Sequence, residues 1–277
     1  MSAGLTAFEA LQQVPGWDPE AATVEELKGG LTNRTYFVTE GDRRCVLRLD
    51  SQQSSMFQFD RSAELAILNA AHAAGIAPAV IYANPESSIL VSEYLEGRTW
   101  EEADLADGAQ LEALASLLRQ VHEIRIEGQA IDIAEVARTY ESYLERRPGL
   151  HAFAARCVEI VESIPGRVDV TCCHKDIVAG NVIENDTLKL IDWEFACKHD
   201  RFFDLASAIG FHNLGARQSA ALLDAYTGGA DSESRERLSE QVRIYDAVQW
   251  LWLATRQLVF PGGWQARRLE ELQQRIR

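Results

Sequence analysis

Two short segments in the second half of the chain carry polar residues in an order that suits phosphoryl transfer. Residues 174–181 read HKDIVAGN, and residues 190–194 read LIDWE. Phosphoryl transfer asks a protein mainly to position the reactants and to neutralise charge. Asp176 could orient or receive the proton of an attacking hydroxyl. Asn181 and Asp192 offer the oxygen ligands that Mg²⁺ prefers.

Each of these residues by itself could be an ordinary turn former, because Asp and Asn are common in turns. The ordered set is harder to explain in that way. A turn at Gly180, followed by a hairpin with Asn185 and Asp186 at its tip, would bring the three side chains to one point. We therefore expect a catalytic and metal-binding centre in this region.

A charge pair is predicted between a strand and the helix that follows it. Residues 44–49 read RCVLRL, a strand pattern that contains Arg48. In the following helix pattern Glu64 shares a face with apolar residues, namely Phe57, Ile67, Leu68 and Ala71. An inward carboxylate needs compensation, and a guanidinium fork can supply it. The alternative is that Glu64 is a solvated helix charge, as we expect Asp60 and Arg61 to be.

The elements around these residues change character along the chain. In the first third, β-like runs and turns alternate around one helix, with strands expected at 24–28, 35–39, 45–49, 79–82 and 89–94 and the helix at 57–74. Beyond Gly97 long helical patterns dominate, at 111–121, 133–146, 152–164, 215–227 and 235–258, around a β-rich segment at 168–195. A further helix is expected at 205–209, with Asp204 as its N-cap.

Composition narrows the class of protein. Hydrophobic residues make up 47% of the 277 residues and charged residues 25%, as in a globular enzyme. The net charge of -15 argues against nucleic-acid binding, which needs a basic surface. An acidic surface favours a cationic substrate. The sequence has no apolar run of about 18 residues, so we expect no membrane span.

The cysteines and the first 20 residues of the chain indicate in which cellular compartment the protein is expected. The five cysteines form no C-x-x-C pair, and we expect them to be buried small hydrophobes. The first 20 residues lack a basic region followed by an apolar one, so secretion is not expected. Both observations predict a cytoplasmic protein.

The segments HKDIVAGNVI and LIDWEFACKHDRFFDLA resemble those of choline/ethanolamine kinases and bacterial thiamine kinases, which share the fold of aminoglycoside phosphotransferases. The resemblance runs from about Leu27 to about Trp250. It implies an ATP- and Mg²⁺-dependent small-molecule kinase with Asp176 as catalytic base and Asn181 and Asp192 as Mg²⁺ ligands. Glu194, in a D-x-E arrangement, resembles an auxiliary metal-site residue. For Asp204 the resemblance implies a second role besides the N-cap, as a brace for the catalytic loop.

The resemblance also assigns nucleotide-binding residues. The segment GGLTNRTY at 29–36 resembles the G-G-x-[ST]-N loop of these kinases, although Gly-Gly in a hairpin is by itself more often only a turn. The predicted nucleotide-binding set is therefore Gly30, Thr32, Asn33, Arg48, Glu64, Glu93 and Leu95. Of these, Glu93 and Leu95 are expected to act through main-chain groups at a hinge.

The implied fold class is α+β and bilobal, of the protein-kinase type. It has an N-terminal five-stranded antiparallel sheet with one main helix and a larger, mostly helical C-terminal lobe with a β-hairpin catalytic region. We expect a nucleotide-binding lobe at residues 1–95. The catalytic and substrate-binding lobe is expected at residues 96–277.

The acceptor is expected to be a cationic amino alcohol, such as choline or ethanolamine, held by aromatic groups. Trp250 aligns with an aromatic substrate position of choline kinases, and Phe211 and Tyr245 are further candidates, although ordinary packing explains those two equally simply. Trp252 lies roughly 200° around a helix from Trp250 and is expected in the core. Thiamine kinase, aminoglycoside phosphotransferase and an inactive nucleotide-binding scaffold remain alternatives. Oligomeric state is left open.

Overall fold

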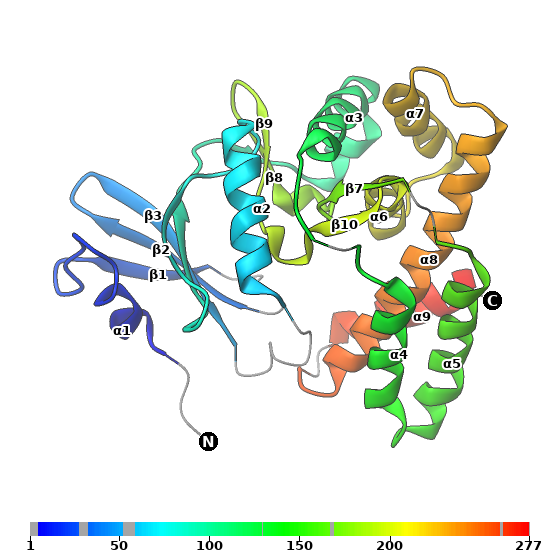
Figure 1. The fold of residues 1–277 in the computed structure, drawn as a ribbon, viewed down its shortest axis with the longest axis horizontal. Helices are drawn as coiled ribbons and strands as arrows, with labels where there is room; N and C mark the ends of the chain where they lie inside the picture. The colour runs from blue at the N-terminus through cyan, green and yellow to red at the C-terminus, as the bar shows by residue number, and fades with distance from the viewer. Residues whose placement is uncertain are drawn as a thin grey trace. The chain divides into compact units, whose positions relative to one another are not determined.

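The protein is described by a computed structural model that covers residues 5–27, 33–51, 59–128, 130–166, 169–260 and 263–276 (Figure 1). The chain forms two compact units. The first consists of Met1–Trp100 and Gly180–Ala196, and the second of Glu101–Ala179 and Cys197–Arg277. The functional division expected at residue 95 stays a prediction. Across the described ranges, every helix is too short or too polar to cross a membrane.

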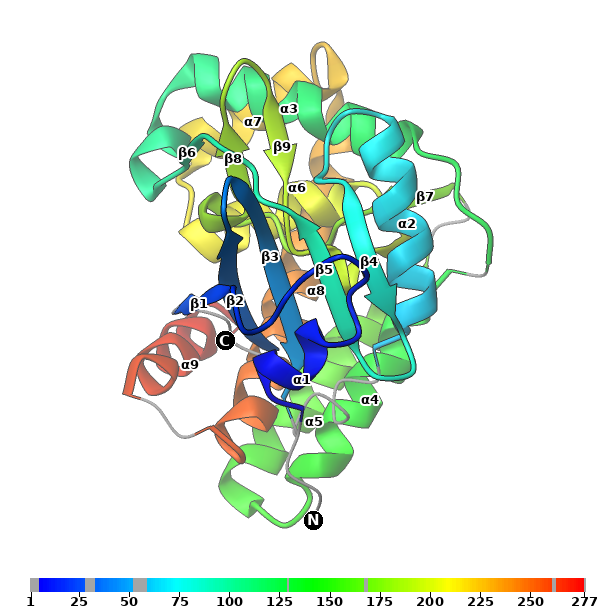
Figure 2. The ribbon, with the colours of Figure 1, turned by 90° about the vertical axis from the view of Figure 1, so that its left-hand side faces the viewer.

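The first unit is built on a five-stranded antiparallel sheet, as predicted. Its strands are β1 Thr23–Leu27, β2 Asn33–Glu40, β3 Arg43–Asp50, β4 Val80–Asn84 and β5 Ile89–Glu93. Their order in the sheet is β1-β2-β3-β5-β4, and Figure 2 shows them side by side. The register pairs Arg48 of β3 with Thr35 of β2 and with Leu90 of β5.

Strand β3 separates the two faces of this sheet by simple alternation. Cys45, Leu47 and Leu49 are buried in a core cluster that also holds Leu11 of the short helix α1, Ala7–Leu11. Arg48 lies between two of these residues in sequence, so its side chain projects from the opposite face. Helix α1 was not predicted, although the sequence carries its signal: Thr6 and Glu9 form a capping box.

Helix α2, Arg61–Ala73, begins after Asp60, whose carboxylate caps the N–H groups of Ser62 and Ala63. Its buried residues lie three and four positions apart, as an inward helix face requires: Glu64, Ile67, Leu68 and Ala71. These four residues were predicted to share the inward face, while the fifth, Phe57, lies outside the described residues. The helix begins at Arg61, later than the predicted start at residue 57. The carboxylate of Glu64 is therefore carried inward by the same stripe that anchors the helix.

The first unit also contains a small three-stranded sheet in the order β6-β8-β9, formed by Arg98–Thr99, Val182–Glu184 and Leu188–Leu190. Two 3₁₀ turns flank its hairpin, η3 Ala179–Asn181 and η4 Trp193–Phe195. Gly97 has φ +152°, and a Cβ there would lie 2.5 Å from the carbonyl oxygen of Glu184. This close approach of two backbones explains why the position has no side chain.

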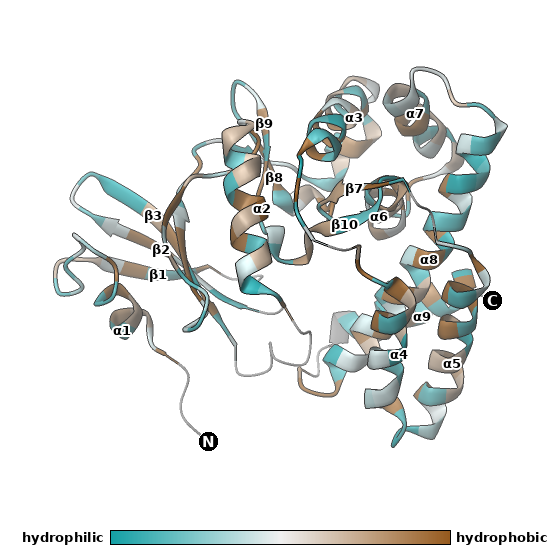
Figure 3. Cartoon of the chain, viewed as in Figure 1, coloured by the Kyte–Doolittle hydropathy of each residue, from teal (hydrophilic) through white to brown (hydrophobic). Residues whose placement is uncertain are grey.

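The second unit is mostly helical. Its helices are η2 Glu102–Ala106, α3 Gly108–Glu123, α4 Ile133–Leu144, α5 Pro148–Ser163, α6 Phe202–His212, α7 Ala216–Thr227, α8 Ser232–Gln257 and α9 Gly263–Ile276. Strands β7, Val170–Cys173, and β10, Cys197–Asp200, pair beside them. Figure 3 shows polar and apolar residues mixed along α4, α5 and α9, as in amphipathic helices. Helix α6 is the exception, since its residues 202–210 are all buried.

All five cysteines are buried, as predicted, and none forms a disulfide. Burial raises the pKa of the Cys45 thiol to about 11 and that of Cys157 to about 12. Burial and the nearby Asp204 charge likewise raise the pKa of Cys172 to about 12 and hold that of Cys173 well above its usual value. Since the thiolate is the reactive form, these residues serve as packing groups.

Candidate active site

Arg48 and Glu64 form a bidentate pair within the first unit. Arg48 Nη1 donates to Glu64 Oε1 at 2.5 Å, and Nη2 donates to Oε2 at 2.8 Å. Their side chains are 11% and 4% exposed. Burial alone would lower the pKa of Arg48, but the Glu64, Glu194 and Asp192 charges raise it, so the guanidinium is held charged. The structure thus brings together the two residues that the sequence paired.

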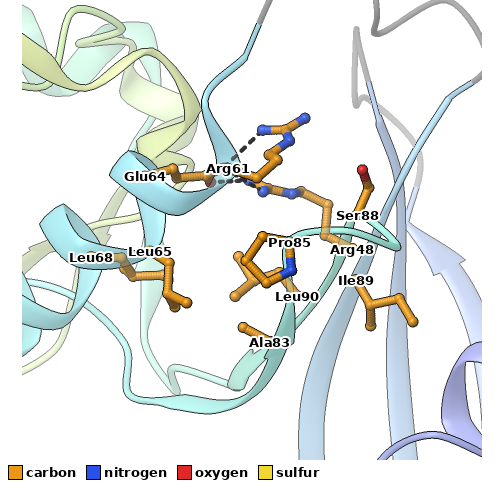
Figure 4. Close-up of a pocket in the computed structure, with 10 residues that line it drawn as sticks. All are labelled: Arg48, Arg61, Glu64, Leu65, Leu68, Ala83, Pro85, Ser88, Ile89 and Leu90. Atoms are coloured by element: carbon orange, nitrogen blue, oxygen red, sulfur yellow. Dashed lines mark hydrogen bonds and ion pairs between the residues drawn. The ribbon is translucent and has the colours of Figure 1, made fainter.

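Glu64 has a second cationic partner that the sequence did not predict. Arg61 Nη1 donates to Glu64 Oε2 at 2.8 Å, and the Arg61 side chain is only 8% exposed. Figure 4 shows the guanidinium groups of Arg48 and Arg61 both directed at this carboxylate. Burial alone would raise the pKa of Glu64, but the charges and hydrogen bonds of the two arginines hold it below its usual value. The expectation that Arg61 is a solvated charge is wrong.

A small cavity of ≈ 20 Å³ lies beside this pair of arginines. Its other lining residues are mostly apolar and come from α2, from β4 and β5 and from the turn between these strands, among them Leu65, Leu68 and Pro85 (Figure 4). A volume of this size holds about one water molecule. The cavity therefore cannot be the site of a nucleotide.

Asn33 and Glu194 meet beside Arg61. Asn33 is the first residue of β2, and its Nδ2 donates to Glu194 Oε2 at 2.6 Å. Arg61 Nη1 donates to the same oxygen at 3.2 Å. Glu194 is therefore oriented by two donors, and its side chain is 2% exposed. The other predicted loop residues, Gly30 and Thr32, lie outside the described residues.

Asn181 and Asp192 lie at the open end of the β8–β9 hairpin. Asn181 immediately precedes β8, and its carbonyl oxygen accepts a hydrogen bond from Ile191 N at 3.0 Å. Asp192 follows directly. Asp192 has φ 64° and ψ 60°, a left-handed conformation that is uncommon for a residue with a side chain. Its carboxylate is 40% exposed and lies 3.8 Å from Arg48 Nη1.

Glu93 and Leu95 occupy the end of β5 and the residues after it. Glu93 is the last residue of the strand and pairs with Cys45. Its backbone N–H donates to Ala79 O at 2.8 Å, and its carboxylate accepts from Ala79 N at 3.2 Å. Leu95 follows outside the strand. The predicted main-chain role of these residues stays a prediction.

In the second unit, the loop that carries Asp176 is held by side chains of α6. Asp204 is fully buried and accepts hydrogen bonds from His174 N at 2.9 Å and Lys175 N at 2.7 Å. Ser207 Oγ accepts from Ile177 N at 3.0 Å. The backbone on both sides of Asp176 is thereby tied to one helix.

His212 extends this support. Its Nε2 accepts from Ala179 N at 3.0 Å, so the imidazole must be unprotonated at that nitrogen. Burial, with the nearby Arg268 charge, lowers the pKa of His212 to about 4. The ring is therefore neutral over the physiological range. Neither Ser207 nor His212 was expected to support the loop.

Asp204 is also bonded to α3, because His122 Nε2 lies 3.0 Å from Asp204 Oδ2. The other ring nitrogen of His122 lies 2.7 Å from the Tyr226 hydroxyl, which can donate to it. Burial alone would raise the pKa of Asp204, but the hydrogen bonds from His122 and His174 hold it low. Asp204 lies inside α6, so its expected N-cap role is wrong; Asp200 accepts from Phe202 N at the helix start instead. The hydrogen bonds from His174 N and Lys175 N confirm the bracing role that the resemblance implied for Asp204.

Lys175 points into the second unit. Its backbone is left-handed, with φ 70°, and its ammonium lies 5.4 Å from the ring centre of Phe203. The ammonium also offsets part of the burial effect that raises the pKa of the Cys197 thiol. The side chain thus belongs to the packing behind the Asp176 loop.

The aromatic residues expected at the acceptor site differ in exposure. Trp250 is 1% exposed, and its ring packs on Phe153 of α5 at 4.7 Å. Trp252 is partly exposed, so the expectation that Trp252 is the core member of this pair is wrong. The helix pattern could not show this, because it is the packing of α5 against α8 that decides which face is buried.

Tyr245 lies close to Asp176. Burial and the Asp176 charge raise the pKa of Tyr245, while Gln249 Nε2 donates to its hydroxyl at 2.8 Å. Phe211 is partly exposed at the end of α6, and Arg268 of α9 donates to its carbonyl oxygen at 3.0 Å. Helix α9 was not predicted, yet its arginine holds this end of α6.

Residues 23–240 match the phosphotransferase enzyme family, and this match spans most of the chain. The chain belongs to this family. The phosphotransferase is 24% identical over 207 residues to Protein LicA of Haemophilus influenzae, a match that covers 72% of this chain and 61% of that protein. It is 23% identical over 282 residues to probable choline kinase 3 of Arabidopsis thaliana, covering 89% of this chain and 80% of that protein.

Among solved structures, the choline/ethanolamine kinase family protein from Mesorhizobium loti gives a TM-score of 0.77 at 22% identity. The match covers 98% of the phosphotransferase and 92% of that chain. At this level of identity the likeness shows the fold. The predicted fold class and the predicted enzyme class, a phosphotransferase, are both confirmed.

The residues that the sequence missed in this phosphotransferase share one property: their partners are far away in the chain. Arg61 contacts Glu194 across 133 positions, and Ser207 contacts Ile177 across 30. The single local signal was the spacing of Arg61 three residues before Glu64, which allows two side chains on a helix to meet.

Proposed function

We propose that this phosphotransferase transfers the γ-phosphate of ATP, with Mg²⁺, to the hydroxyl of an amino alcohol. The observation that carries the proposal is the hairpin that holds Asn181 and Asp192 at its open end, five and sixteen residues after Asp176 in the sequence. Phosphoryl transfer uses a residue that orients or accepts the proton of the attacking hydroxyl, together with oxygen ligands for metal. This chain offers those groups in that order.

In the proposed step, Asp176 accepts the proton of the acceptor hydroxyl as its oxygen bonds to the γ-phosphorus. The bond between that phosphorus and the β,γ-bridging oxygen breaks, and ADP leaves with the bond electrons. Arg48 is proposed to face the phosphates with its charge fixed by Glu64. Asp204, Ser207 and His212 hold the backbone of the Asp176 loop, so the carboxylate needs little rearrangement to act.

The residues of the first unit fit a divalent cation. Asn181 offers an amide oxygen and Asp192 a carboxylate that is 40% exposed, both of them hard ligands. Around them, the two positive charges of Arg48 and Arg61 lie beside a larger number of carboxylates, those of Asp50, Glu64, Asp192 and Glu194. A bound Mg²⁺ would offset this excess of negative charge and neutralise the phosphate oxygens. We propose Asn181 and Asp192 as its ligands, with Glu194 as an auxiliary group.

The proposed acceptor class rests on the named relatives and on charge. Those relatives are a probable choline kinase and a choline/ethanolamine kinase family protein. The net charge of -15 suits a cationic acceptor. Phe211, which is partly exposed, and Tyr245, which is buried but lies near the Asp176 charge, are the aromatic groups that we propose for its ammonium group. Trp250 is proposed to pack behind them, since it is 1% exposed and its ring contacts Phe153.

The test is a transfer assay with ATP and Mg²⁺ against choline, ethanolamine, thiamine and an aminoglycoside. We expect choline or ethanolamine to give the highest kcat/KM. Asp176→Asn should lower kcat by about 10²-fold or more while ADP affinity barely changes, because general-base losses are of this size. Preference for thiamine or the aminoglycoside would overturn the acceptor class. Transfer to none of the four, or near-normal turnover by Asp176→Asn, would overturn the mechanism.

A further inference from the structure

Arg61 is among the most highly connected side chains of the first unit. Its Nη2 donates to Asp50 Oδ1 at 2.6 Å and to Asn33 Oδ1 at 3.2 Å. Its Nε donates to Asp50 Oδ2 at 3.3 Å. Its Nη1 donates to both Glu64 and Glu194, and its plane lies 4.3 Å from the ring centre of Phe59. One guanidinium therefore ties together β2, β3, α2 and the segment after Asp192.

The contacts with Asn33 and Glu194 close a ring of hydrogen bonds. Arg61 donates to the side-chain oxygen Oδ1 of Asn33, and the side-chain nitrogen Nδ2 of Asn33 donates to Glu194 Oε2 at 2.6 Å. Arg61 also donates to that same oxygen of Glu194. The guanidinium thus fixes which way the Asn33 amide faces, because its oxygen must point toward a donor.

This ring joins two segments that the proposed reaction uses. Asn33 belongs to the glycine-containing segment at 29–36 that the resemblance assigns to the nucleotide, and Glu194 lies two residues after the proposed metal ligand Asp192. Asp192 adopts a left-handed backbone conformation, which persists only where its surroundings hold it. A side chain that anchors Glu194 therefore also anchors the backbone that carries Asp192.

We propose that Arg61 is a positioning residue for the metal-bound nucleotide: by holding Asn33 and Glu194 together, it sets the affinity for Mg²⁺-ADP and Mg²⁺-ATP. The inference rests on the proposed function, since it concerns the same site. Arg61 acts through its protein partners and does not touch the nucleotide. Lysine cannot replace it, because an ammonium group lacks the planar fork that reaches several acceptors in fixed directions.

The experiment compares ADP binding with and without Mg²⁺ by isothermal titration calorimetry. For Arg61→Lys, which keeps the charge, we expect ADP affinity in the presence of Mg²⁺ to fall by about 10-fold or more, as for loss of an outer-shell partner of a metal ligand. Without Mg²⁺, ADP affinity should stay within about twofold of the wild type, because the altered side chain does not face the nucleotide.

The matched control is Arg43→Lys. Arg43 lies on β3 of the same unit, but its side chain is 50% exposed and pairs with Glu40. An exposed pair of this kind contributes little, so both ADP affinities should equal those of the wild type. Thermal melting of each variant reports whether the fold is retained.

A second variant keeps the inference testable if Arg61→Lys does not fold. Asn33→Ala removes the middle of the ring, and because Asn33 is also in the predicted nucleotide-binding set, its loss of ADP affinity should be larger with Mg²⁺ than without it. If both single variants fold, the double variant should bind ADP in the presence of Mg²⁺ no more weakly than the single variant with the lower affinity, since contacting residues act as a unit.

Equal losses of ADP affinity with and without Mg²⁺ in Arg61→Lys would mean that Arg61 binds phosphate directly and would overturn the positioning role. Unchanged affinity in both variants would overturn it too. A wild-type protein that binds no ADP at all would instead overturn the proposed function, and the inference with it.

Discussion

Replacing Asp204 with Asn changes one atom at the centre of the support for the Asp176 loop. The Asp204 carboxylate accepts from His174 N, Lys175 N and His122 Nε2 at 2.7 to 3.0 Å. An amide of the same shape keeps one acceptor oxygen and turns the other into a donor. One or more of the three donors then faces an N–H₂ group in a fully buried site.

The size of the effect follows from these contacts. Hydrogen bonds to a charged group contribute about 1.5–3 kcal/mol each, and a buried donor left without its acceptor costs about 1–3 kcal/mol. We therefore expect Asp204→Asn to lower the free energy of unfolding by about 3–5 kcal/mol. At about 2–4 °C per kcal/mol, the melting temperature should fall by roughly 6–20 °C. Because the loop shifts, kcat should also fall by about 10²-fold.

Urea unfolding and the transfer assay measure the two effects on the same samples. The matched control is Asp224→Asn, since Asp224 is half exposed and its nearest arginine is 3.7 Å away. That variant should change the free energy of unfolding by less than about 1 kcal/mol. If Asp204→Asn behaved like this control in stability and turnover, the view that α6 holds the catalytic loop through Asp204 would be refuted.

Three further predictions follow from burial. Arg48→Ala and Glu64→Ala should each lower kcat/KM strongly, and the double variant should lose less than the sum, as a double-mutant cycle would show; additive losses would contradict coupling. Burial holds the pKa of His199 at about 3 and that of His212 at about 4. Below pH 6.5 the unfolded chain therefore binds more protons than the folded protein, because both histidines protonate freely only when unfolded. The free energy of unfolding should fall by about 3 kcal/mol between pH 6.5 and 5. His212→Asn should remove about half of this fall. A flat urea-unfolding profile would contradict this. Trp250→Ala should cost about 3–5 kcal/mol in urea unfolding, and a loss below about 1 kcal/mol would contradict its place in the core.

The sheet and the Arg48–Glu64 pair could be predicted because their signals are local. Alternating burial along β3 separates Cys45, Leu47 and Leu49 from Arg48, and this alternation is visible in the sequence. The spacing of Glu64, Ile67 and Leu68 places the carboxylate on the inward face of α2 in the same way. Where a residue is fixed by its own strand or helix period, sequence reasoning was sufficient.

Arg61 could not be predicted because its burial comes from other segments. It is the first residue of α2, where an arginine is normally solvated, and its partners Asn33 and Glu194 are 28 and 133 positions away. Two supports of the Asp176 loop, Ser207 and His212, could not be predicted for a related reason. They accept hydrogen bonds from backbone N–H groups, such as that of Ala179, and every residue except proline has such a group, so the sequence does not indicate which one is bound.

Asp204 and the tryptophans of α8 show a different limit. Asp204 resembles an N-cap when the helix is expected to begin at residue 205, but α6 begins at Phe202 and buries it completely. Trp250 and Trp252 lie on different faces of α8, and the choice of the core face depends on α5. Helix boundaries and packing partners are therefore the points at which local reasoning failed.

Because its five cysteine thiols are buried, this protein should allow chemical labelling at introduced cysteines with little reaction at the native ones. Their protonated, inaccessible sulfurs should react slowly with maleimides, so introduced surface cysteines would take up dye first. Glu86 in the first unit and Glu236 in the second are both exposed. A protein carrying Glu86→Cys and Glu236→Cys, labelled with a donor and an acceptor fluorophore, would report by energy transfer how the separation of the two units responds to Mg²⁺, nucleotide and acceptor, with all native cysteines left in place.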